Sequence, residues 1–211
     1  KSYDYGDGLI NGVLRPYIQQ ANPLCSNQLD TNESEGNSVN AIGFAEVRFL
    51  KDFKFTSTNS VSSEETRSTI TTNPWFGQYA SQNGAITVEH DRTWSYNYQQ
   101  LLTWHHQFDL HEVDAMLGHE YYRRRNYVLY GDKTNMYTFP SNDMASAVNT
   151  GSTNSYRNDY NTEGWFGRVQ YNYDQKYFAS MSYRRDASSR FAPENRWGNF
   201  WSFGGAWLIS K

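Results

Sequence analysis

The sequence is poor in cysteine, in proline and in long apolar segments: it has one cysteine and five prolines among 211 residues. One cysteine excludes an internal disulfide and a zinc site built from cysteines. No segment approaches the roughly 18 consecutive apolar residues of a transmembrane helix. The absence of such a segment does not exclude a transmembrane β-barrel, because the strands of a barrel need only about 9–11 residues each. Because the chain starts in a loop-like segment without a signal peptide, we expect an internal piece of a longer protein.

The charge is nearly balanced, with 19 basic and 22 acidic residues. Such a balance gives no global attraction to nucleic acid or to anionic lipid, so we expect no nucleic-acid partner. One local cluster, Arg123–Arg125, is interpreted as a solvated strand end rather than as an anion site.

Aromatic side chains are abundant, with 17 tyrosines, 12 phenylalanines and seven tryptophans, although only 37% of the chain is hydrophobic. Amphipathic rings in such numbers are typical of sugar-binding surfaces and of the aromatic girdles of membrane β-barrels. A helical bundle is poorly supported.

A two-residue period dominates the C-terminal quarter of the chain, and predicts three strands in a row. In the first, Trp165, Val169 and Tyr171 alternate with polar side chains. A short link at Asp174-Gln175 leads into the second strand, and the third runs from about residue 199 to 209. We therefore predict a hairpin followed by a returning strand.

The rest of the chain shows the same alternation, interrupted by long polar links. Short links carry an aspartate (Asp52, Asp109, Asp174), whereas the long ones are rich in Gly and Asn. Short turns on one side and long loops on the other are typical of outer-membrane barrels. The alternative is a soluble, aromatic-rich β-sandwich. The expected segments are a loop over 1–39, a hairpin over 41–65, a loop over 66–84, a long hairpin over 85–130, a loop over 131–161 and three strands over 162–209.

The three C-terminal strands also carry a motif in three parts. These are Tyr171-Asn172-Tyr173-Asp174-Gln175-Lys176-Tyr177, then Arg184-Arg185-Asp186-Ala187-Ser188-Ser189-Arg190-Phe191, then Asn195-Arg196-Trp197-Gly198-Asn199-Phe200 with Trp207 after it. In order and spacing they resemble the barrel region of the SusC/RagA family of TonB-dependent outer-membrane transporters. Ala187 stands where that family usually has Gly, and Trp201 where Pro is common.

The resemblance implies an all-β fold: an antiparallel transmembrane β-barrel segment of about seven strands from a larger barrel, with 22 strands expected. Extrapolation from seven strands makes the complete chain roughly fourfold to fivefold longer. The implied function is part of an active importer of oligosaccharides or peptides in the outer membrane of a Gram-negative cell. Implied partners are a SusD-like surface lipoprotein, the TonB complex acting through a plug domain, and lipid or lipopolysaccharide. The alternative function is a soluble carbohydrate-binding module.

No catalytic residue, metal site or cofactor is predicted. Neighbouring His105 and His106 point to opposite faces of a strand, and His111 lies about 26 Å of extended chain from His119, so a shared histidine site is not expected. Glu112 and Asp114 share a face and are similar to the two carboxylates of glycosidases, but a hydrated wall explains them better. No nucleophile elbow or phosphate-binding loop occurs.

Two groups of residues remain as candidates for function. Arg168, Gln170, Arg184 and Asp186 lie on the polar sides of their predicted strands, so we expect them to face the barrel lumen or the plug. Trp75, Phe76 and Tyr79 lie in a long predicted loop, where they are candidates for contact with a ligand or a lid lipoprotein, although loop aromatics often pack against their own loop.

Overall fold

The computed structural model describes residues 9–10, 13–14, 23–75 and 77–209. The strands are long, and the helical elements are short and lie between them. None of the helices among these residues is long and apolar enough to cross a membrane. The elements are β1 (Leu9–Ile10), β2 (Val13–Leu14), α1 (Pro23–Leu29), β3 (Thr31–Phe49), β4 (Phe53–Thr72), β5 (Ala85–Phe108), β6 (His111–Met136), β7 (Ala147–Tyr173), β8 (Tyr177–Ser188) and β9 (Trp197–Trp207), with 3-10 turns η1 (Ala80–Gln82), η2 (Met144–Ser146) and η3 (Pro193–Asn195).

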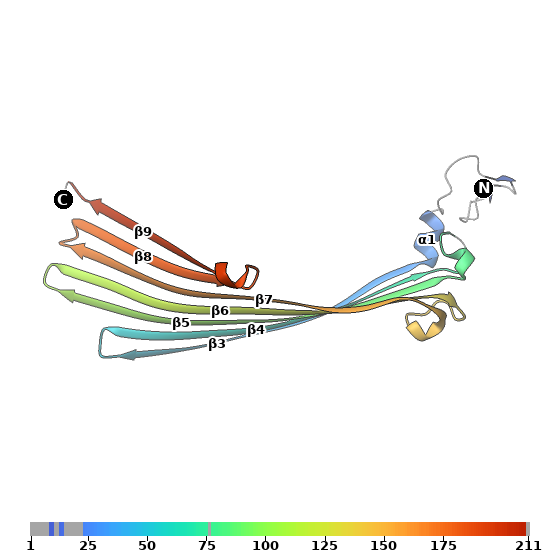
Figure 1. Ribbon diagram of the computed structural model, residues 1–211, viewed down its shortest axis with the longest axis horizontal. Coiled ribbons are helices and arrows are strands. Elements are labelled where there is room, and N and C mark those ends of the chain that lie inside the picture. The colour runs from blue at the N-terminus through green and yellow to red at the C-terminus, as the bar shows by residue number, and fades with distance from the viewer. Residues whose placement is uncertain (1–8, 11–12, 15–22, 76, 210–211) are drawn as a thin grey trace. The chain divides into compact units, whose positions relative to one another are not determined.

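Seven strands form one sheet in the order β3-β4-β5-β6-β7-β8-β9, so each strand pairs with its neighbours in the sequence (Figure 1). The remaining pair, β1 and β2, forms a separate two-stranded sheet. This antiparallel meander confirms the all-β fold class predicted from the alternation. Three hairpins, β3–β4, β5–β6 and β7–β8, have their tight turns at one end of the sheet (Figure 1).

The tight turns need residues that tolerate a left-handed backbone. Asp109 and Asp174 have φ angles of 53° and 51°, and Gln175 follows with 52°. Positive φ at the central residues matches the twist of the turn to that of the flanking strands, and aspartate accepts this conformation more readily than most side chains. Successive turns are also joined, because the amide of Asp174 donates to the carbonyl of Leu110 at 2.8 Å.

The strands continue well beyond the segments in which apolar and polar residues alternate. The loop expected over 131–161 is wrong for most of its length, because β6 ends at Met136 and β7 begins at Ala147. The loop expected over 66–84 is shortened in the same way by β4. A polar strand keeps its backbone hydrogen bonds to its neighbours even where both of its faces meet water, so the two-residue pattern disappears before the strand does.

The first expected loop, over 1–39, also differs from the structure where the structure describes it. Helix α1 and the first part of β3 lie within it. Much of the remainder of this segment falls outside the described residues. The start of β3 is rich in Asn, Ser and Glu, and therefore carries no hydrophobic signal that could have predicted it.

The chain divides into two compact units, each made of parts of several strands. The first comprises the described residues within Lys1–Ser38, Glu64–Arg92 and Asn126–Arg157. It holds the small buried core, which consists of Ile86, Met136 and Ala147, with Val88, Phe139 and Met144 packed against it. A side-chain hydrogen bond also joins two of its segments: Nδ2 of Asn73, just after β4, donates to Asp30, which lies between α1 and β3, at 2.7 Å.

The second unit comprises Val39–Ser63, Thr93–Arg125 and Asn158–Lys211, and holds the three tight turns. It leaves large apolar side chains uncovered along one face of its strands. Trp201 and Phe203 of β9 are 69% and 66% exposed, and Met181 of β8 is 49% exposed. A soluble monomer rarely leaves such a large continuous apolar surface open. The lipid-facing wall of a membrane barrel carries this pattern.

Close to the tight turns, this face carries a row of aromatic rings that we call the aromatic belt. Neighbouring rings have centroids 4.8 to 6.3 Å apart, and the row includes a residue from each of the seven long strands. Its members are Phe49, Phe53, Trp104, His106, Phe108, His111, Tyr173, Tyr177 and Trp207. Barrel proteins carry girdles of aromatic residues where their walls cross the membrane interface.

Candidate functional site: the polar face of the second unit

The face opposite the aromatic belt carries the predicted charged and polar residues, together with the rings of Phe178 and Phe200, and we call it the polar face. Across the β7–β8 pair, Phe166 lies opposite Arg184, Arg168 opposite Ser182, and Gln170 opposite Ser180. Directly opposed residues share a face of the sheet. Arg168, Gln170 and Arg184 therefore lie on one face, as the alternation predicted. Asp186 is two residues from Arg184 and lies on the same face.

Arg184 is the best connected of these side chains. Its Nε donates to both carboxylate oxygens of Asp186, at 2.8 and 2.7 Å. Its Nη2 donates to Oε1 of Glu120 on β6, and its guanidinium lies over the ring of Phe166, 5.2 Å from the centroid. Glu120 was not among the predicted site residues, although it has the same strand parity as Glu112 and Asp114. One cation thus joins three consecutive strands.

Two glycines make room for this network. A Cβ at Gly118 would overlap the ring of Phe166, so the ring lies directly over the β6 backbone. A Cβ at Gly164 would lie 2.6 Å from Oδ1 of Asp186. Both positions therefore need glycine for close approach of a neighbouring side chain rather than for an unusual backbone angle.

A hollow of about 480 Å³, which we call the outer hollow, lies beside the Arg184 network. Glu120, Arg184 and Asp186 supply charge to its wall, and Phe191 and Phe200 supply aromatic rings. Phe191 belongs to the loop between β8 and β9, which begins directly after Ser188 and carries the Ser189-Arg190-Phe191 part of the sequence motif. Rings beside charged hydrogen-bonding groups are suited to polar ligands with an apolar side, such as sugars and peptides.

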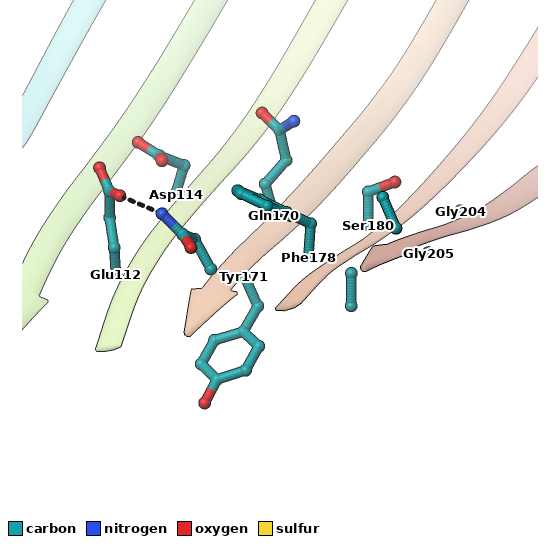
Figure 2. A pocket seen from close by; sticks show the side chains of 11 residues that line it. Glu112, Asp114, Gln170, Tyr171, Phe178, Ser180, Gly204 and Gly205 are labelled. Carbon is teal, nitrogen blue, oxygen red and sulfur yellow. Dashed lines mark hydrogen bonds between the residues drawn. The ribbon is translucent and has the colours of Figure 1, made fainter. Parts of the chain in front are cut away.

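Two further hollows lie nearer to the tight turns and differ in charge. One, of about 370 Å³, includes Glu112, Asp114 and Gln170, and Figure 2 shows the two carboxylates side by side on one strand. The amide of Asn172 donates to Oε2 of Glu112 at 2.9 Å. The second hollow, of about 440 Å³, is bordered by Asp52, His105 and Asp114 and by a basic set, Arg48, Lys51, Lys54 and Arg168.

Four histidines have separate partners. His90 contacts Glu65, His106 contacts Asp52, His111 contacts the Tyr171 hydroxyl at 2.6 Å, and His119 contacts Glu163 at 3.1 Å. Within the described residues, the one group of three or more metal-ligating side chains that lie close together contains a single histidine, His105. The fifth, His105, lies 2.8 Å from Asp114. Counting the hairpin register outward from the turn at Asp109 would have predicted this last pair.

The loop aromatics are only partly described. Trp75 is 55% exposed and packs edge-on against Phe139, with ring centroids 5.2 Å apart. The Tyr79 carbonyl accepts hydrogen bonds from Gln82 and Gly84 and so closes the turn. Phe76 lies outside the described residues. Trp75 therefore contacts its own unit, and it still presents about half of its surface.

Comparison with known proteins gives the fold and the type of barrel. No protein-family model matches the chain. TonB-dependent receptor P3 of Formosa agariphila is 26% identical over 192 residues, and TonB-dependent receptor SusC of Bacteroides thetaiotaomicron is 29% identical over 198 residues. Each alignment covers 90% of this chain and 19% of the relative. The structure of the RagAB peptide transporter superposes on this chain with a TM-score of 0.83 at 22% sequence identity. The match covers 92% of this chain and 23% of the transporter chain. The chain fits a barrel segment of the SusC/RagA family.

The chain spans about a fifth of the length of the curated relatives it matches. Another solved match, the RagAB peptide importer in its "open-open" state, has a TM-score of 0.81. The relatives are named as receptors and transporters rather than as enzymes, which agrees at the level of the family with the absence of a predicted catalytic residue.

Proposed function

We propose that the chain is part of a TonB-dependent active importer in the outer membrane, which takes up oligosaccharides or peptides together with a SusD-like surface lipoprotein. The observation that carries the proposal is the seven-stranded antiparallel sheet with one polar and one uncovered apolar face, matched over nine-tenths of the chain by TonB-dependent receptors. Transport energy comes from the TonB complex acting on a plug domain of the complete receptor.

In this proposal the polar face lines the lumen. Charge on the lipid side at the membrane midplane costs about 2–4 kcal/mol for each Arg or Lys, which favours the lumen for Arg168 and Arg184. Gln170 and Asp186 lie on the same side. These residues form a hydrated wall that also meets the plug. Lipid and lipopolysaccharide contact the opposite, aromatic side.

Trp75, Phe76 and Tyr79 are proposed as contacts for substrate or for the lid lipoprotein. The support is that Trp75 is braced by an edge-on contact with Phe139 and is still 55% exposed. A braced aromatic ring loses little conformational entropy when it stacks on a sugar ring or packs against a protein.

Uptake by cells that carry the full-length receptor tests the proposal. Labelled oligosaccharides and labelled peptides are supplied in parallel, and uptake of one class should require both the receptor and TonB. Trp75→Ala should lower uptake or lipoprotein capture about tenfold, the usual loss when an exposed aromatic anchor is truncated. Tyr156→Ala, at a residue of similar exposure (55%) on β7, is the matched control and should have no effect. TonB-independent uptake, or no uptake of either class, would contradict the proposal.

The alternative, a soluble carbohydrate-binding sandwich, predicts two sheets packed on a shared apolar core. Within the described residues the seven long strands form a single sheet, and its apolar face is exposed. Fractionation separates the two functions directly: the importer stays with the outer membrane until detergent is added, whereas a sandwich is released as a soluble monomer.

A further inference from the structure

Three side chains on the polar face gather close to the turn between β5 and β6. They are His105, Glu112 and Asp114, and one ligand atom from each lies within 4.8 Å of the others. His105 Nδ1 is 2.8 Å from Oδ1 of Asp114. Among the described residues, no other group of three or more metal-ligating side chains comes this close together.

The hairpin itself brings the three together. Glu112 and Asp114 are two residues apart on β6 and therefore point to the same side of the sheet. The turn at Asp109-Leu110 returns the chain so that His105 of β5 lies beside Asp114. Side chains opposite one another on paired strands are about 5 Å apart at Cβ, and the longer Glu112 covers the diagonal distance. The geometry is set by two paired strands and not by a loop.

The chemistry of the set is that of a transition-metal site. Zinc accepts imidazole nitrogen and carboxylate oxygen ligands, the imidazole favours it over calcium and magnesium, and three protein ligands leave a fourth position open. Asn172 of β7 donates to Oε2 of Glu112, at 2.9 Å, and so orients that carboxylate from outside the ligand set. The side chains of His105 and Asp114 are 57% and 51% exposed, so water or a substrate group can complete the coordination.

Two of the nearby positive charges are paired with a carboxylate outside the ligand set. Arg48 and Lys54 both contact Glu46, at 2.9 and 3.7 Å. Arg168 borders the adjacent hollow with His105 and Asp114, but it is not in the ligand set. His106, next in the chain, points to the other side of the sheet and contacts Asp52 at 2.9 Å.

We propose that His105, Glu112 and Asp114 form a binding site for a zinc-class divalent transition-metal ion on the polar face, near the β5–β6 turn. The ion takes the place of the hydrogen bond between His105 and Asp114, any proton on the coordinating ring nitrogen is released to water, and Glu112 supplies the second carboxylate. The proposal goes beyond import and holds whether the receptor carries oligosaccharides or peptides.

Zinc binding to the full-length receptor tests the site. The purified receptor in detergent is stripped with a chelator and titrated with Zn²⁺ alone, with a competing fluorescent chelator as the readout. Asp114→Asn and Glu112→Gln should each weaken one binding step about tenfold or more, and His105→Gln should do the same. His106→Gln removes an imidazole one residue away on the opposite face, and should leave the titration unchanged.

Two further measurements separate a metal site from a simple acidic surface. Co²⁺ in place of Zn²⁺ should give a visible absorption band that Glu112→Gln and Asp114→Asn reduce, and excess Ca²⁺ should not displace it. Thermal unfolding of each variant shows whether it is folded, and Glu112→Gln serves if His105→Gln fails to assemble. Identical zinc titrations for wild type and Asp114→Asn, or equal displacement by Ca²⁺, would overturn the proposal.

Discussion

Arg184 of β8 donates a hydrogen bond to Glu120 of β6, two strands away, across the face of β7. Both side chains are partly exposed, at 41% and 34%, so neither charge is fully desolvated. Asp186 holds the other side of the same guanidinium, at 2.7 Å. The register of β6 against β8 is therefore set by side chains as well as by the backbone ladders through β7.

Replacing Arg184 should loosen this part of the barrel wall. Arg184→Ala removes charged hydrogen bonds to two carboxylates and leaves those carboxylates side by side, so we expect a loss of about 1–3 kcal/mol in the free energy of unfolding. Arg184→Lys should recover only part of it, because an ammonium group lacks the planar fork of donors. Chemical unfolding of the full-length receptor in detergent measures the difference. A double-mutant cycle with Glu120→Gln that shows no coupling would contradict the network.

Gly118 should not tolerate a larger residue while Phe166 is present. Gly118→Ala places a methyl group where the Phe166 ring lies, and the ring cannot move freely because Arg184 covers it. We expect a loss of about 1–3 kcal/mol, typical of overpacking. Gly118→Ala combined with Phe166→Ala should lose less than the sum of the two single variants. Equal stability of Gly118→Ala and wild type would show that the Phe166 ring can adopt another rotamer without cost.

The two faces of β8 should respond oppositely to a new charge. Met181 lies on the uncovered apolar face, so Met181→Arg should cost about 2–4 kcal/mol and reduce insertion into the outer membrane. Ser180, the neighbouring residue on the polar face, lies opposite Gln170, and Ser180→Arg is the matched control that should insert normally. Quantitative immunoblots of outer-membrane fractions compare the two. The reverse ranking would invert the assignment of lumen and lipid faces.

Asn83 should stabilise the end of the first unit that carries η1. Its backbone is left-handed, with φ of 57°, and its Nδ2 donates to Oδ1 of Asn135 and to the carbonyl of Met136, each at 3.0 Å. Asn83→Ala loses both bonds and strains the backbone, so local hydrogen exchange of the 80–84 turn should rise about tenfold. Asn83→Gly keeps the backbone and loses only the bonds, and its exchange should rise less. An unchanged exchange rate in Asn83→Ala would rule out this role.

Much of the second unit could be predicted from the sequence. Where a sheet has one apolar and one polar face, apolar and polar residues alternate along each of its strands, and this pattern is visible in the sequence. The positions of Arg168 and Arg184 followed from parity alone. The first unit could not be predicted in this way. The start of β3 is polar on both faces, and at the end of β6 and the start of β7 the buried Met136 and Ala147 are isolated among polar residues, so no apolar alternation marks these segments as strands.

The site shows the same division. Parity placed Glu112 and Asp114 on one face, but their proximity to His105 depends on how β5 and β6 pair, which the parity of a single strand does not contain. The pairing of Glu120 with Arg184 depends on a distance across two strands, and the room for Phe166 depends on a glycine in a third strand. None of these relationships lies within the few residues that a periodicity argument compares.

The aromatic belt has a mechanical consequence. Each of the seven long strands contributes at least one ring, and the rings contact one another from β3 to β9 without a gap. Sliding one strand by a single residue, about 3.4 Å, would separate its ring from those on both sides. The strands are thus held at a common depth. In a bilayer whose thickness does not match, single strands cannot shift to new depths. The lipids around the segment must therefore adjust their thickness to the belt.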